Sequence, residues 1–126
     1  NKNLLAEIIA SADISIAPGP IETFCLAALE SLASGTPVVA SETSAVGELI
    51  LAGHKDSVGI TAGNTAVEFA DAIEILMMQV ETDISLSSRC VAQAAKFSWS
   101  TTAQSLHATA VNEVVVATQP VGIKAA

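Results

Sequence analysis

Two glutamates bracket the segment of the sequence whose residue types best suit ligand binding. Glu22 follows a short Pro-Gly-Pro-Ile loop, and Glu30 lies eight residues further along. Between them apolar residues recur at helical spacing, and Thr23 has the side chain of a helix N-cap. The first backbone N–H groups of such a helix are free to bind an anion such as a phosphate. These groups belong to Phe24, Cys25 and Leu26. A carboxylate two turns along the same helix, Glu30, can accept two hydrogen bonds from a vicinal diol such as a ribose.

A pair of carboxylates can also catalyse glycoside hydrolysis. If the whole segment between Glu22 and Glu30 were helical, the rise would separate them by roughly 12 Å along the axis. Hydrolases hold their two carboxylates about 5 to 9.5 Å apart. The loop at residues 18–23 could shorten the separation, so the spacing disfavours hydrolysis without excluding it. Binding roles fit the two glutamates better.

Short β-branched strands alternate with helices along the chain. Strands are predicted at residues 14–17, 38–40 and 58–60, and helices at 4–9, 24–34, 46–51, 84–97 and 99–116. A further helix, capped by Asn64, is predicted to carry Val67, Ala70, Ile73, Leu76 and Met77 on one face. This order indicates an α/β fold with a partial Rossmann-like parallel sheet of about three strands, flanked by helices. Ligands of such sheets bind at the carboxyl ends of the strands, where residues 18–30 lie.

The composition excludes several classes of partner. The chain has 126 residues, which suits one domain, and its net charge is −8, with five scattered basic residues. Binding to nucleic acid through a basic patch is therefore not expected, and an anionic membrane surface would repel this segment. The apolar runs are too short to span a membrane. The two cysteines and two histidines suggest neither a metal site nor a disulfide framework, which fits a reducing cytoplasm.

The longer motifs resemble the C-terminal domain of the retaining GT-B glycosyltransferases of family 4. The resemblance rests on Ser11-Ala-Asp-Ile, on Glu22-x7-Glu30 with Thr-Phe inside it, and on Ser34-Gly-Thr-Pro-Val-Val-Ala-Ser41. It continues through Glu48, Gly53, Gly59 and Phe97-Ser98-Trp99, and covers roughly residues 4–110. It implies that residues 1–118 are the C-terminal half of a GT-B nucleotide-sugar-binding domain, a fragment of a longer enzyme, and that residues 119–126 are a tail.

The resemblance also implies a function and roles for individual residues. The family transfers a hexosyl group from a nucleotide sugar to an acceptor held by a separate N-terminal domain, which would lie in cis. In this sequence Glu22 would contact the transferred sugar, and Glu30 would bind the nucleotide ribose. The residues expected to meet the sugar and diphosphate are Thr23, Phe24, Cys25 and Leu26. The loop sequence is most similar to that of actinobacterial mannosyltransferases, so GDP-mannose is the preferred donor among NDP-sugars, with no further cofactor and no metal.

The sequence departs from the family pattern at three places. Thr23-Phe24-Cys25 stands where the family has Gly-Phe-Gly, and the side chain at position 25 narrows the approach to the phosphate. Ser44-Ala45 replaces a Gly-Gly pair before Glu48. No basic residue lies between positions 3 and 54 to neutralise a diphosphate. The chain alone is therefore expected to be inactive and to bind a donor weakly at best.

Several single residues have structural explanations beside the functional ones. Cys25 is expected to be a small buried apolar residue rather than an activated thiol, and Glu48 suits a structural contact as well as a site role. His54 and His107 read as solvated or structural residues. Packing roles are predicted for Phe97, Trp99, Met77 and Met78.

Two functional alternatives stay open beside the glycosyltransferase: a non-catalytic GT-B-like scaffold or regulatory domain, and another GT-B enzyme such as a nucleotide-sugar epimerase. An exposed edge of the half-sheet would invite dimerisation. The expected location is cytoplasmic, with a peripheral position of the full-length enzyme at the inner face of the membrane left open.

Overall fold

The computed structural model describes the backbone of residues 1–118 and the side chains of Asn1 and of residues 3–111. The tail expected at residues 119–126 lies outside the described residues. The chain divides into two compact units, one from Asn1 to Ala95 and one that begins at Lys96 and contains helix α6 (Trp99–Thr118). The first unit holds the sheet and every residue proposed for the site. Among the described residues, no helix combines the length and the apolar character needed to cross a bilayer.

The first unit alternates helices and strands in the expected order. Its elements are α1 (Lys2–Ala10), β1 (Ser15–Ala17), α2 (Leu26–Ala33), β2 (Val38–Ser41), α3 (Val46–Leu49), β3 (Gly59–Ala62), α4 (Ala66–Thr82) and α5 (Leu86–Ala94). The three strands form one parallel sheet in the order β1-β2-β3. Ile16 pairs with Val39, and Val39 pairs with Ile60. The predicted α/β fold with a three-stranded parallel sheet is therefore confirmed.

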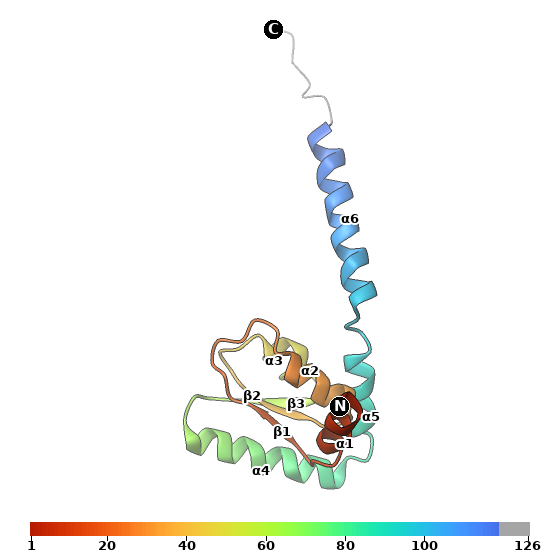
Figure 1. Ribbon diagram of the computed structural model, residues 1–126. Coiled ribbons are helices and arrows are strands. Elements are labelled where there is room, and N and C mark those ends of the chain that lie inside the picture. The colour runs from red at the N-terminus through yellow and green to blue at the C-terminus, as the bar shows by residue number, and fades with distance from the viewer. Residues whose placement is uncertain (119–126) are drawn as a thin grey trace. The chain divides into compact units, whose positions relative to one another are not determined.

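Helices cover both faces of this sheet. In Figure 1, α4 lies along one side of the strands, and α2 and α3 lie on the other. Helix α5 packs mainly against α2. All four residues of β2 are buried, and the largest fully buried side chains around them include Leu32 of α2 and Leu76 of α4. The carboxyl ends of the strands consequently open onto three neighbouring loops, at residues 18–25, 42–45 and 63–65.

Two local predictions about α4 were wrong, one on its N-cap and one on the side that faces the core. Helix α4 is capped by Thr65 instead of Asn64, because Thr65 and Glu68 form a reciprocal capping box. The side of α4 that packs on the core carries Phe69, Ala72, Ile73, Leu76 and Val80, whereas Val67, Ala70 and Met78 are exposed. Trp99 lies at the start of α6 in the second unit, and its packing role stays a prediction.

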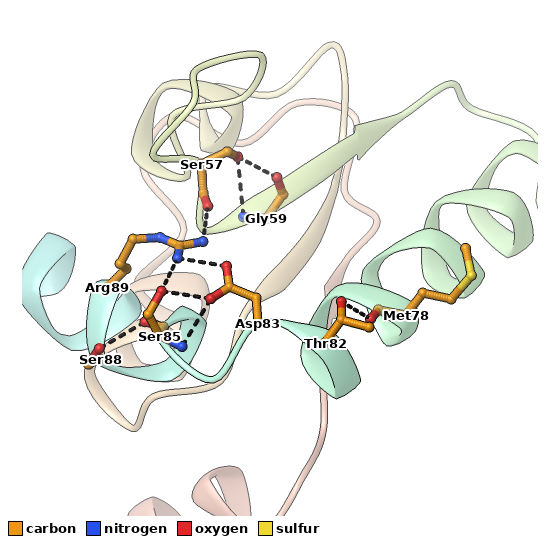
Figure 2. A network of polar contacts seen from close by, with 8 residues as sticks. All are labelled: Ser57, Gly59, Met78, Thr82, Asp83, Ser85, Ser88 and Arg89. Atoms are coloured by element: carbon orange, nitrogen blue, oxygen red, sulfur yellow. Dashed lines mark hydrogen bonds and ion pairs between the residues drawn. The ribbon is translucent and has the colours of Figure 1, made fainter.

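A polar network at the amino ends of the strands joins α5 to the start of β3 (Figure 2). Arg89 Nη1 donates to Asp83 Oδ2 at 2.7 Å, and Arg89 Nη2 donates to the Ser57 carbonyl at 3.4 Å. Ser85 donates both its backbone N–H and its hydroxyl to Asp83 Oδ1, at 2.9 and 2.6 Å. The hydrogen bonds from Ser85 and then from Arg89 lower the pKa of Asp83 from 3.8 to about 2. Asp83 therefore stabilises the fold as a carboxylate.

This pKa shift predicts an acid-sensitive contribution to stability. Because the pKa of Asp83 is lower in the folded state, its contribution is complete above about pH 4 and is lost as the pH falls towards 2. The difference in the free energy of unfolding between the wild type and Asp83→Asn should shrink over that window. Urea unfolding at a series of pH values measures it. Asp71→Asn, at an exposed position of α4, is the control and should show a smaller change. A pH-independent difference for Asp83→Asn would contradict the assignment.

Candidate functional site

The candidate site lies where β1 ends and α2 begins. Helix α2 starts at Leu26, two residues later than predicted, and its N-cap is Cys25. The predicted N-cap, Thr23, is therefore wrong, and no side chain caps this helix. The first intrahelical bonds are accepted by the Cys25 carbonyl, from Ala28 N–H and Leu29 N–H. Within the described residues, the N–H groups of Leu26 and Ala27 have no hydrogen-bond acceptor, so they can receive an anion from solvent.

Cys25 has a backbone conformation that side chains rarely adopt. Its φ is 49° and its ψ is 83°, in the left-handed region, and it is one of two described non-glycine residues with positive φ. This conformation turns the chain from the 18–25 loop into α2. Glycine adopts it freely, which gives a physical reason for the glycine that the resemblance places at this position. The thiol is partly buried against the core, as expected of a small apolar residue.

The two glutamates lie on either side of this turn, and both are exposed to solvent. Glu30 is four residues after Leu26, so it lies on the same face of α2, about 6 Å further along the axis. It is one turn into the helix, where two turns were predicted. Glu22 precedes α2 in the irregular 18–25 loop, so the separation estimated for a wholly helical segment does not apply. The edge of the sheet thus presents a carboxylate, an anion-binding helix end and a second carboxylate in sequence order.

The position of Glu22 depends on its loop. Its carbonyl accepts a hydrogen bond from Ala45 N–H at 2.9 Å. Its side chain folds back over Gly19, where a Cβ atom would come within 3.0 Å of Glu22 Oε1. A larger residue at position 19 would therefore crowd this position of the carboxylate, which would shift by a few tenths of an ångström. Thr43 Oγ1 donates to the Pro20 carbonyl at 2.8 Å and holds the same loop from the 42–45 side.

Two surface cavities adjoin these loops, and neither is lined by Glu22 or Glu30. One, of about 520 Å³, is mainly apolar and lies between the prolines of the 18–25 loop and the start of α4. Its lining residues are Pro18, Pro20, Asn64, Thr65, Ala66 and Phe69. The other, of about 490 Å³, lies beside α3, and Glu42, Glu48 and His54 contribute to its lining. Glu48 is thus exposed beside the candidate site, without a contact to Glu22 or Glu30 that would assign it a role.

Positive charge is absent from this edge among the described side chains of the first unit. Arg89 is paired with Asp83 at the opposite, amino end of the strands. Lys55 lies in the segment that leads into the amino end of β3. The described residues also contain no group of three His, Cys, Asp or Glu side chains able to hold a metal ion.

Sequence reasoning missed the hydroxyl and amide groups that hold the site loops together. Ser41, Thr43 and Asn64 connect the three loops through hydrogen bonds, with the Thr43 backbone N–H donating to the Ser41 hydroxyl. The signal was present, since Ser41 and Thr43 come within three residues of the end of the second predicted strand and Asn64 comes four residues after the third. It was overlooked because such residues are common in turns, and only the structure shows that they meet.

Known proteins are similar to this chain over most of its length. A family model described as glycosyl transferases group 1 matches residues 2–79. A GDP-mannose-dependent alpha-(1-6)-phosphatidylinositol dimannoside mannosyltransferase of Mycobacterium tuberculosis is 44% identical over 110 residues, covering 86% of this chain and 27% of that protein. A D-inositol 3-phosphate glycosyltransferase of Mycobacteroides abscessus is 42% identical over 103 residues, covering 81% of this chain and 22% of that protein.

A solved structure shows the same fold. Sucrose-phosphate synthase from Thermosynechococcus elongatus matches with a TM-score of 0.70 over 94% of this chain and 29% of that chain, at 23% sequence identity. The chain thus spans about a quarter of the length of its relatives, between 22% and 27% of each curated protein.

The backbone strain at position 25 gives a stability prediction. A left-handed conformation costs a residue with a side chain about 1–2 kcal/mol. Glycine avoids this cost, but its greater freedom in the unfolded chain offsets part of the gain in stability. Cys25→Gly should therefore be more stable than Cys25→Ala by about 1 kcal/mol, although glycine is the smaller residue. Urea unfolding of the two variants makes the comparison, since both lack the thiol. An alanine variant as stable as the glycine variant would show that position 25 is unstrained.

Proposed function

Because the chain belongs to the glycosyl transferases group 1 family and has the GT-B fold, we propose that it forms the nucleotide-sugar-binding part of a retaining glycosyltransferase. The enzyme transfers a hexosyl group, preferably mannosyl, from a nucleoside diphosphate sugar to an acceptor. The uncapped start of α2 between Glu22 and Glu30 is the observation that carries the proposal. An anion site between two carboxylates matches a donor whose diphosphate joins two groups rich in hydroxyls.

In this proposal each part of the donor meets one part of the site. The diphosphate lies against the N–H groups of Leu26 and Ala27, where the helix dipole favours negative charge. Glu30, one turn along α2, accepts hydrogen bonds from the ribose hydroxyls. Glu22 lies on the other side of the helix end and accepts hydrogen bonds from the transferred sugar. Thr23, Phe24 and Cys25 form the stretch of backbone that approaches the diphosphate.

The same arrangement suits a mechanism without a side-chain nucleophile. Retention of configuration would follow from attack by the acceptor on the face from which the diphosphate leaves. The departing phosphate oxygen takes the proton of the acceptor hydroxyl. The chain contributes hydrogen-bond acceptors that fix the sugar and a helix end that stabilises the charge on the leaving group. Glu22 then acts by orienting the sugar, so its replacement should affect catalysis through geometry.

GDP-mannose is the donor that we propose first. Support comes from the mycobacterial relative described as GDP-mannose-dependent, which is 44% identical to this chain. The residues that would recognise the nucleotide base and neutralise the diphosphate are not evident at this edge of the sheet. We therefore propose that the chain works as part of a longer enzyme, with an acceptor-binding domain in cis.

Exposed apolar side chains on the first unit support that arrangement. Leu4, Leu5 and Ile8 of α1 and Ile16 of β1 are each between 48% and 57% exposed. They lie on the edge strand β1 and on the helix that precedes it, where further strands of a larger sheet would add. A preceding part of the same protein covers this surface in the proposal. Dimerisation through the same edge stays a prediction.

Calorimetric titration tests the proposed function. The full-length enzyme and the 126-residue chain are titrated with GDP-mannose, UDP-glucose, GDP and UDP. We expect the full-length enzyme to bind one nucleotide selectively and the 126-residue chain to bind it far more weakly. Glu30→Gln should weaken both nucleotide and nucleotide-sugar binding about 10- to 100-fold, since it removes hydrogen bonds to a charged group. Glu22→Gln should weaken mainly the nucleotide sugar.

Glu74→Gln is the matched control, because Glu74 is an exposed glutamate of α4, away from the site. It should bind every ligand as the wild type does. Failure of the full-length enzyme to bind any of the donors would overturn the transferase proposal and favour a scaffold that keeps the fold without the activity. Equal losses for GDP and GDP-mannose in Glu22→Gln would contradict the role given to Glu22.

A further inference from the structure

The 18–25 loop carries Glu22, yet it has few means of holding its own shape. It contains no helix or strand, and two of its residues are prolines, which have no N–H to donate. Its carbonyl groups must therefore accept hydrogen bonds from elsewhere if the loop is to keep one conformation. Two such bonds reach it from the 42–45 loop: Thr43 Oγ1 donates to the Pro20 carbonyl, and Ala45 N–H donates to the Glu22 carbonyl.

Thr43 is itself held by a rigid part of the fold. Its backbone N–H donates to Ser41 Oγ at 3.3 Å, and the two hydroxyl oxygens lie 3.0 Å apart. Ser41 is the last residue of β2 and is completely buried. Its hydroxyl donates to Asn64 Oδ1 at 2.7 Å, in the loop between β3 and α4. Thr43 therefore holds the 18–25 loop through its hydroxyl and the buried end of β2 through its backbone N–H, and Ser41 extends this connection to the loop after β3.

The contact reaches Glu22 through the neighbouring glycine. The side chain of Glu22 rests on Gly19, with Oε1 and Cγ both about 3 Å from the place of a Cβ atom. Gly19 is joined directly to Pro20, whose carbonyl Thr43 holds. A shift of the Pro20 carbonyl would move the backbone on which the Glu22 carboxylate rests. Glu30 would stay in place, because α2 holds it.

We propose that Thr43 is a positioning residue of the donor site, whose hydroxyl fixes the 18–25 loop and so holds the Glu22 carboxylate against the transferred sugar. The inference rests on the proposed function and deepens it. It predicts that one hydroxyl, outside the Glu22-x7-Glu30 segment, controls the recognition of the sugar without affecting the recognition of the nucleotide. Ser41 accepts a hydrogen bond from the backbone N–H of Thr43 and donates one to Asn64, so these two residues fix the position of Thr43.

Thr43→Val removes the hydroxyl and keeps the shape of the side chain, and Thr43→Ser keeps the hydroxyl. In the full-length enzyme we expect Thr43→Val to raise the dissociation constant for the preferred nucleotide sugar roughly 3- to 10-fold, the worth of one hydrogen bond. The dissociation constant for the free nucleotide should change less than about twofold, and Thr43→Ser should restore wild-type sugar binding.

Thr82→Val is the matched control. The Thr82 hydroxyl also donates to a backbone carbonyl, that of Met78, at 2.7 Å, but within α4 and beside the network of Figure 2. Its loss should leave the binding of both ligands unchanged. An equal loss of sugar binding in Thr82→Val would show that the effect of Thr43→Val reflects general destabilisation, and would overturn the proposal.

Hydrogen exchange separates the failure of this inference from the failure of the proposed function. In the 126-residue chain, Thr43→Val should speed exchange of the backbone amides at residues 21–24, and Thr43→Ser should not. If the wild-type enzyme binds no donor, the proposed function fails whatever the exchange shows. If the wild type binds a donor and Thr43→Val binds it equally well, or if exchange is unchanged, the positioning role is wrong.

Discussion

The structure depends on the burial of the short strand β2. All four of its side chains are buried, and it pairs with β1 on one side and β3 on the other. A strand without an exposed face must lie between two covering layers, which here are α2 and α3 on one side and α4 on the other. Parallel pairing then brings the carboxyl ends of all three strands to one edge. The candidate site lies at this edge because that is where the chain leaves the buried sheet.

The same burial organises the loops above the strands. Ser41 is the last residue of β2, and its hydroxyl is buried. A buried polar group needs hydrogen-bond partners. The Ser41 hydroxyl donates to Asn64 Oδ1 after β3 and accepts from the backbone N–H of Thr43, whose own hydroxyl holds the 18–25 loop after β1. One buried hydroxyl thus lies at the centre of contacts among three loops that are far apart in the sequence. The loops carry the candidate site, and the core determines their positions.

Backbone strain and the distribution of charge both characterise this edge of the first unit. Cys25 is held in a left-handed conformation at the start of an uncapped helix, and such strained positions gather at functional sites. The described arginine of the unit is used at the opposite edge, where it lowers the pKa of Asp83 and joins α5 to β3. The site edge therefore offers backbone N–H groups and carboxylates, and no described cation. This division explains why we expect the chain to need a partner domain to bind a diphosphate tightly.

The sequence by itself determined the order of strands and helices, the parallel sheet and the segment that carries Glu22 and Glu30. It could do so because β-branched runs, helical spacing and glycine or proline breaks are local signals. Helix ends were less predictable: Thr23 and Thr65 are both suitable caps, and packing decided that only the second one caps its helix. The side of α4 that faces the core, the turn at Cys25, and the contacts of Thr43 with Pro20 and Ser41 were decided by tertiary structure alone. Each of these depends on which groups compete for the same buried space or the same hydrogen bond, and that competition exists only once distant parts of the chain have come together.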